Sequence, residues 1–78
     1  MFDINDIPYN SENKQYTCKC QCASPQDAET LYASNLHISR MLSVTGEMFP
    51  DGSTVYIRAG KSEDVIKIAK YINSRLKH

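Results

Sequence analysis

The stretch Phe49–Lys77, FPDGSTVYIRAGKSEDVIKIAKYINSRLK, decides the fold, because it holds a turn, a strand and a helix in direct succession. Pro50-Asp51-Gly52 is typical of a hairpin turn, since proline presets φ, aspartate can bond the backbone and glycine tolerates positive φ. Residues 54–59, TVYIRA, alternate between polar and apolar side chains, which predicts a strand. Because this is the most regular strand pattern in the chain, we expect it at the centre of a small sheet.

A helix is predicted directly after this strand. Gly60 lets the backbone turn, Ser62 is the expected N-cap, and the acidic side chains of Glu63 and Asp64 suit the positive end of the helix dipole. Apolar residues then recur at the three- and four-residue spacing of one helical face, at Val65, Ile68, Ala69, Ile72 and Leu76. We expect this stripe to pack on the apolar side of the strand before it.

The upstream sequence supplies the remaining elements. Residues 14–23, KQYTCKCQCA, alternate strictly and predict a first strand. Ser24-Pro25-Gln26-Asp27 predicts the start of a helix that runs to about Ser43. Residues 44–49 predict a weaker strand, which Gly46 interrupts. The expected fold is a single small α+β domain over residues 14–78 in β-α-β-β-α order, a three-stranded antiparallel sheet of order 1-3-2 with two helices on one face.

Residues 1–13, MFDINDIPYNSEN, mix apolar and acidic side chains, and Pro8 interrupts any regular element. We expect a partly ordered acidic and hydrophobic tail, because chain ends are loose unless tied down. The alternative is a recognition segment whose spaced apolar residues dock into a basic groove on a partner.

Composition narrows the classes of function. The 78 residues hold nine Lys or Arg and nine Asp or Glu, so the formal net charge is zero. The chain therefore lacks the net positive charge that is the simplest sign of a nucleic-acid-binding protein. Residues 1–30 are nevertheless net acidic and residues 31–78 net basic. No apolar run reaches the roughly 20 residues of a membrane helix, and no secretion signal opens the chain, so we expect no membrane contact and a cytoplasmic protein.

Cys18, Cys20 and Cys22 form a C-x-C-x-C pattern that could suggest a metal site. Side chains two residues apart on a strand stand roughly 7 Å apart, which is too far for three sulfurs to share one tetrahedral zinc. Buried free cysteine behaves as a small apolar residue. We therefore expect core cysteines and no metal or cofactor, with His37 on the following helix only a weak fourth ligand.

No catalytic motif occurs in the sequence: there is no nucleophile elbow, phosphate-binding loop, zinc-protease motif or pair of carboxylates. The two histidines, His37 and His78, fall on the outer side of a predicted helix and at the last residue. Because catalysis needs an acid, base or nucleophile held in a pocket, we expect no enzymatic activity.

The surface of greatest interest is the side of the sheet that faces away from the helices. Our leading hypothesis is a non-enzymatic protein-binding module, a small inhibitor or adaptor of the kind that phages and mobile elements encode, which occludes a surface of its partner. The residues expected to contact that partner are Lys19, Tyr56, Arg58, Met48, Phe49, Phe2 and Tyr9. The alternative is binding of single-stranded RNA or DNA. Its residues would be Lys19, Arg58, Lys61, Lys67 and Lys70. A third interpretation is a homodimer sealed by the edge strand near Gly46 or by the open sheet.

The run Phe49-Pro50-Asp51, followed by Val55-x-Ile57-Arg58-x-Gly60, resembles the DinI-like regulators of the bacterial DNA-damage response. The resemblance covers residues 49–60 and agrees with the expected topology. The last helix departs from that family, because it ends in the basic residues Arg75, Lys77 and His78 where the family is acidic. No function is carried across from the resemblance.

Overall fold

The computed structural model describes residues 1–76, and the basic residues Lys77 and His78 lie outside the described part of the chain. The elements in chain order are β1 (Tyr9–Asn10), β2 (Gln15–Gln21), α1 (Pro25–Ser34), α2 (Ile38–Met41), β3 (Glu47–Asp51), β4 (Thr54–Ala59) and α3 (Ser62–Leu76). They form a small α+β domain, as predicted.

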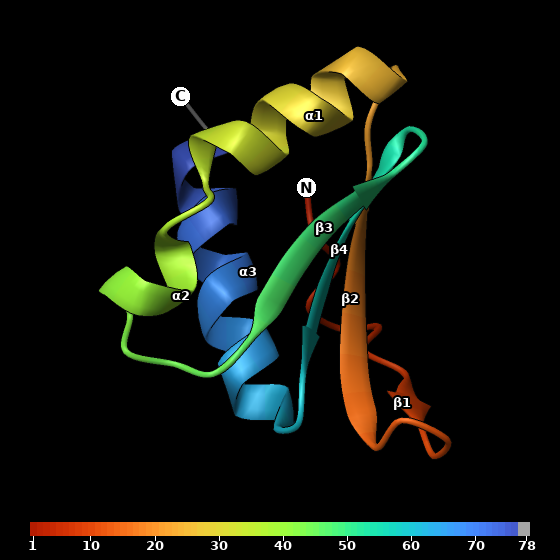
Figure 1. Cartoon of the computed structure of the whole chain (residues 1–78), viewed down its shortest axis with the longest axis vertical. Coiled ribbons are helices and arrows are strands. Elements are labelled where there is room, and N and C mark those ends of the chain that lie inside the picture. Colours follow the sequence, from red (N-terminus) through yellow and green to blue (C-terminus); the bar gives the residue numbers. More distant parts are fainter. Residues whose placement is uncertain (77–78) are drawn as a thin grey trace.

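The sheet is antiparallel throughout and has the order β1-β2-β4-β3 (Figure 1). The prediction of three strands is wrong by one, because β1 adds a fourth strand at the edge of β2. The three strands that were predicted do lie in the predicted order, with β4 between β2 and β3. β1 escapes prediction because two residues are too short to show a period, so only the pairing of Tyr9 with Tyr16 and of Asn10 with Gln15 defines it.

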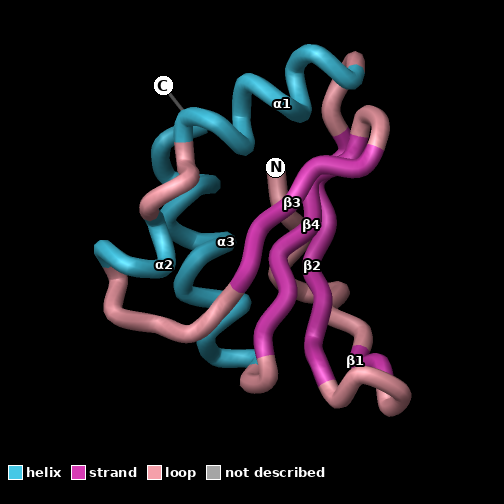
Figure 2. Tube along the Cα trace, in the orientation of Figure 1, coloured by secondary structure: helices cyan, strands magenta, loops and turns pink. Residues whose placement is uncertain are grey.

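The helices α1 and α3 stand on the same side of the sheet (Figure 2) and bury its apolar face. Burial along β4 matches the predicted alternation at every residue, since Val55, Ile57 and Ala59 are buried while the residues between them are not. The predicted stripe of α3 is buried up to Ile72. Leu76, predicted to continue the stripe, is 44% exposed because it falls in the last turn, beyond the part of α3 that covers the sheet.

The helix predicted from Ser24 to about Ser43 is wrong in its length, because the structure divides it into α1 and the single turn α2. The break falls at Asn35, a buried residue whose side-chain amide donates to the Leu31 carbonyl at 2.8 Å. Asparagine side chains that bond the nearby backbone compete with helical hydrogen bonds. After the break, Ile38 is turned into the core and Leu36 into solvent.

Ser24 caps α1 as predicted, since its hydroxyl accepts a hydrogen bond from the Asp27 backbone N–H at 3.2 Å. Replacing Ser24 with alanine is expected to lower the free energy of unfolding by about 1 kcal/mol, because one N–H at the start of the helix loses its partner. Urea unfolding followed by circular dichroism measures the change. Ser34→Ala is the matched control at the other end of α1, and an equal loss in both variants would contradict the capping role.

Gly46 lies where the segment before β3 passes closely over α3. A side-chain carbon at this position would stand 2.8 Å from the Cδ1 atom of Ile68. The interruption of the second predicted strand by glycine is therefore a close approach between backbone and helix, and β3 begins only after it, at Glu47.

Residues 1–13, expected to be a partly ordered tail, contact the domain at several points. Figure 1 shows the N-terminus between the helices and the sheet. Phe2 is only 3% exposed and belongs to the core. The side-chain amide of Asn73 on α3 bonds both the N–H and the carbonyl of Phe2, each at 2.8 Å. Farther along, the Cys18 thiol donates to the Asp3 carbonyl at 3.4 Å, and the Thr17 N–H donates to the Pro8 carbonyl at 3.1 Å. We call residues 2–10 the N-terminal strap, because they run from the core to the edge of β2.

Candidate functional site

The side of the sheet away from the helices, which we call the open face, carries three rows of side chains across β2, β4 and β3. The strand register sets these rows. They are Thr17, Arg58 and Glu47; Lys19, Tyr56 and Phe49; and Gln21, Thr54 and Asp51. Side chains opposite one another on neighbouring strands stand about 5 Å apart, so each row is a line of direct neighbours.

The middle of the open face holds an aromatic stack. The rings of Phe49 and Tyr56 lie with their centroids 5.3 Å apart at an interplanar angle of 21°. The guanidinium of Arg58 lies 4.7 Å from the centre of the Phe49 ring. An aromatic pair contributes about 0.5–1.5 kcal/mol beyond its buried area, and a cation over a ring at an exposed site about 0.5–1 kcal/mol. These contacts hold the two rings in place before any ligand arrives.

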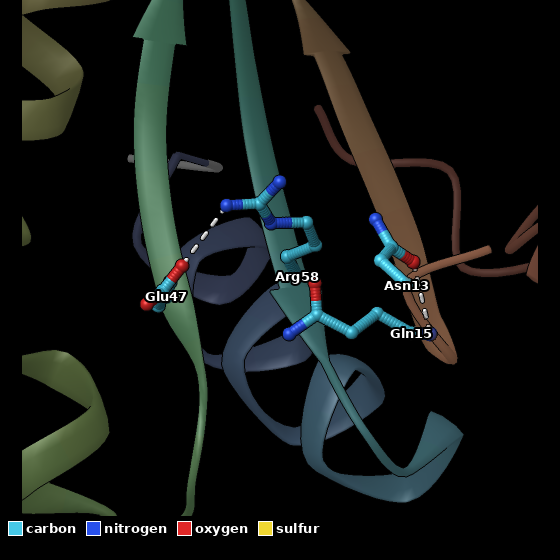
Figure 3. Close-up of polar contacts among 4 residues, drawn as sticks. All are labelled: Asn13, Gln15, Glu47 and Arg58. Atoms are coloured by element: carbon cyan, nitrogen blue, oxygen red, sulfur yellow. Dashed lines mark hydrogen bonds and ion pairs between the residues drawn. The ribbon is translucent and has the colours of Figure 1, made fainter. Parts of the chain in front are cut away.

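Arg58 joins the aromatic stack to a charged partner. Its Nη2 atom lies 3.1 Å from the Oε2 atom of Glu47, directly across the β3–β4 pair, and Figure 3 shows this ion pair. Figure 3 also shows the Gln15 side chain extending from β2 towards Arg58. The Glu47 carboxylate is two-thirds exposed, so the ion pair adds at most about 1 kcal/mol to stability. Its larger effect is to neutralise the positive charge of Arg58, which is therefore not free for a phosphate.

The structure brings together four of the seven residues predicted to contact a protein partner: Lys19, Tyr56, Arg58 and Phe49 share the open face. Met48, next to Phe49 on β3, turns to the other side and packs against the core. The sequence pattern missed Glu47 as the partner of Arg58 and missed Phe49 as the neighbour of Tyr56. The turn predicted at Pro50-Asp51-Gly52 is misplaced, because Pro50 and Asp51 belong to β3 and the turn is Gly52-Ser53. The register follows only from the true turn, because a two-residue turn fixes the pairing of both strands.

The other two predicted contact residues lie away from the open face. Phe2 is a core residue, which corrects its prediction as an exposed anchor, because packing under α3 removes it from any partner. Tyr9 lies on β1 and is half exposed, with its ring 4.9 Å from that of Tyr16.

The basic residues proposed for nucleic acid do not form one surface. Lys19 and Arg58 lie on the open face of the sheet. Lys61 is exposed in the connection between β4 and α3, and Lys67 and Lys70 are exposed on α3, in the helix layer that covers the opposite face. A single strand would have to wrap around the domain to reach both sets.

The three cysteines are free thiols, and Cys18 and Cys20 belong to the core. Burial, assisted by the nearby carboxylate of Asp3, raises the pKa of the Cys18 thiol to about 11. Burial also raises the pKa of Cys22. Because the thiolate is the form that binds metals and attacks electrophiles, these shifts make both thiols less reactive. Within residues 1–76 no group of three His, Cys, Asp or Glu side chains is arranged to hold a metal ion.

The geometry defines a small α+β domain whose sheet has one face covered by helices and one face open, with an ordered aromatic stack at its centre. None of the helices in residues 1–76 combines the length and apolar character needed to cross a membrane. No protein-family model, curated protein or solved structure matches the chain.

Proposed function

We propose that this chain is a non-enzymatic protein-binding module, an inhibitor or adaptor that occludes a surface of its partner with the open face. The observation that carries the proposal is the stack of Phe49 on Tyr56 beneath the Arg58 guanidinium. Tyrosine and arginine are among the residue types enriched in the few positions that dominate binding energy at protein interfaces. The proposal places the protein in the cytoplasm, where its thiols would stay reduced.

Two further features support a protein partner. The aromatic rings are already fixed by their neighbours, so binding would cost little side-chain entropy. The face also carries both signs of charge, with Lys19 and Arg58 against Glu47 and Asp51, which suits the mixed rim of a protein surface better than a polyanion.

Replacing Tyr56 or Phe49 with alanine is expected to weaken binding to the partner at least tenfold, since each change removes half of the stack. The partner is first isolated by affinity capture with the wild-type domain and then titrated against each variant. Lys67→Ala, in the helix layer, is the matched control and should bind as the wild type does. Partners that bind all of the variants equally would contradict the role of the open face, provided that circular dichroism shows the variants folded.

Nucleic-acid binding is the second candidate, and the structure gives it one favourable observation. Phe49 adds a second aromatic ring beside Tyr56, and Lys19 continues the same row, so two stacking platforms lie next to a free ammonium. Fluorescence anisotropy with dT and rU oligonucleotides at two salt concentrations tests it. Binding that falls steeply with salt and is weakened by Lys19→Ala would favour this candidate over a protein partner.

A further inference from the structure

The N-terminal strap and the open face enclose a hollow beside the aromatic stack. It has a volume of about 210 Å³ and is lined by Asp6, Pro8, Thr17, Lys19 and Tyr56. Pockets that bind drug-sized molecules begin at roughly 300 Å³, so this hollow is suited to a single side chain. Because β2 and β3 flank β4 on opposite sides, Tyr56 has Phe49 as its neighbour towards β3 and the hollow towards β2.

The lining combines apolar walls with unused polar groups. Pro8 and the Tyr56 ring supply flat apolar surface. Asp6 and Lys19 line the same hollow with opposite charges, yet they form no ion pair, since the one salt bridge among the described residues joins Arg58 to Glu47. Neither side chain has a hydrogen-bond partner within residues 1–76. An acceptor and a donor are therefore both available to a ligand.

The strap holds this hollow open before any ligand arrives. One end of the strap is fixed in the core by Phe2 and its two hydrogen bonds to Asn73. The other end is fixed to the edge of β2 by the hydrogen bond from Thr17 to Pro8. Between them the Asp6 N–H closes a turn on the Asp3 carbonyl at 3.2 Å. Asp6 and Pro8 therefore sit on a segment that is anchored on both sides.

We propose that the hollow receives a tyrosine side chain of the partner, an inference that rests on the proposed protein-binding function. The ring would lie between Pro8 and Tyr56, and its hydroxyl would donate to the Asp6 carboxylate and accept from the Lys19 ammonium. A phenolic hydroxyl is one donor and one acceptor, which matches this pair of neighbours.

Other side chains fit the hollow less well. An arginine would pair with Asp6 but bring a second positive charge beside Lys19, and a carboxylate would pair with Lys19 but bring a second negative charge beside Asp6, whereas a neutral hydroxyl can pair with both. A phenylalanine would fill the apolar space but leave both charged groups desolvated and without a partner, which is costly in binding.

Binding of isolated amides, followed by nuclear magnetic resonance of the ¹⁵N-labelled domain, tests the proposal. N-acetyltyrosinamide is expected to shift the backbone amides of Thr17, Lys19 and Tyr56 in a saturable way, with a dissociation constant in the millimolar range. N-acetylphenylalaninamide should bind about tenfold more weakly, and N-acetylargininamide more weakly still. Absence of saturable shifts, or equal affinity for the three amides, would overturn the proposal.

Two variants test the assigned contacts. Asp6→Ala and Lys19→Met should each reduce the preference for tyrosine over phenylalanine to threefold or less, whereas Lys67→Met, on α3 in the helix layer, should leave it unchanged. An undiminished preference in both hollow variants would also overturn the assignment. The outcome is separate from that of the proposed function: if Phe49→Ala abolishes capture of the partner while no amide binds, the open face is confirmed and only the tyrosine inference fails.

Discussion

Replacing Phe2 with alanine is expected to lower the free energy of unfolding by about 3 kcal/mol, the low end for deleting a buried phenylalanine ring. The ring is 3% exposed and belongs to the main core, between the helices and the sheet. A domain of this length has a total stability of roughly 4–12 kcal/mol, so the loss is a large part of it. The chain holds no tryptophan, so urea unfolding is best followed by far-ultraviolet circular dichroism.

Met1→Ala is the control for this prediction, because the neighbouring Met1 side chain is mostly exposed and its loss should change stability by less than about 0.5 kcal/mol. Asn73→Ala should fall between the two, at about 1–2 kcal/mol, since it removes both side-chain hydrogen bonds to the Phe2 backbone. If Phe2→Ala matched Met1→Ala, the first residues would be the loose tail that their composition predicts.

The sequence predicts the fold well where a regular spacing of apolar residues continues along a whole element that packs on the core. The apolar residues of β4 alternate with polar ones and are buried. The apolar residues of α3 follow the helical period and are buried from Val65 to Ile72. The predicted helix from Ser24 fails where a single side chain, Asn35, bonds the backbone and interrupts the helix. Its apolar neighbours continue the helical spacing past the break, so periodicity alone could not locate it.

The burial of Phe2 illustrates a second limit. Within residues 1–13 the apolar residues alternate irregularly with acidic and polar ones, so no period predicts that Phe2 is buried. Its position is decided by Asn73, which is 71 residues away in the chain. Burial set by one long-range contact leaves no local signal, and this is why the hollow beneath the strap could not be predicted either.

The candidate site could be predicted in part, unlike the regular elements, which were predicted well, and the burial of Phe2, which was not. Alternation along residues 14–23 and 54–59 predicts that Lys19, Tyr56 and Arg58 point away from the buried side chains, and the structure has them on the open face. Phe49 and Glu47 follow only once the register of the hairpin is known, since a shift of one residue would have turned Met48 to the open face instead. The aromatic stack is thus a consequence of the length of the turn.

Raising the pH from 8 to 10.5 is expected to lower the free energy of unfolding of the wild type by about 2 kcal/mol more than that of Cys18→Ala. The Cys18 thiol has a pKa of about 11 in the fold against 9.0 as its ordinary value, chiefly because it is buried. Between these two values the unfolded chain releases a proton that the folded chain keeps. A raised pKa therefore stabilises the fold below about pH 9, and this contribution is lost as the pH rises towards 11.

Urea unfolding of both proteins at each pH, with a reductant present, measures this difference. All other titratable groups are the same in both proteins, so comparison with Cys18→Ala isolates the thiol. Cys22→Ala retains Cys18 and should keep most of the alkaline loss. Parallel pH profiles for the wild type and Cys18→Ala would mean that water reaches the thiol. Because Cys18 donates to the Asp3 carbonyl, the strap would then be loosely seated, and the hollow that it lines would not be preformed.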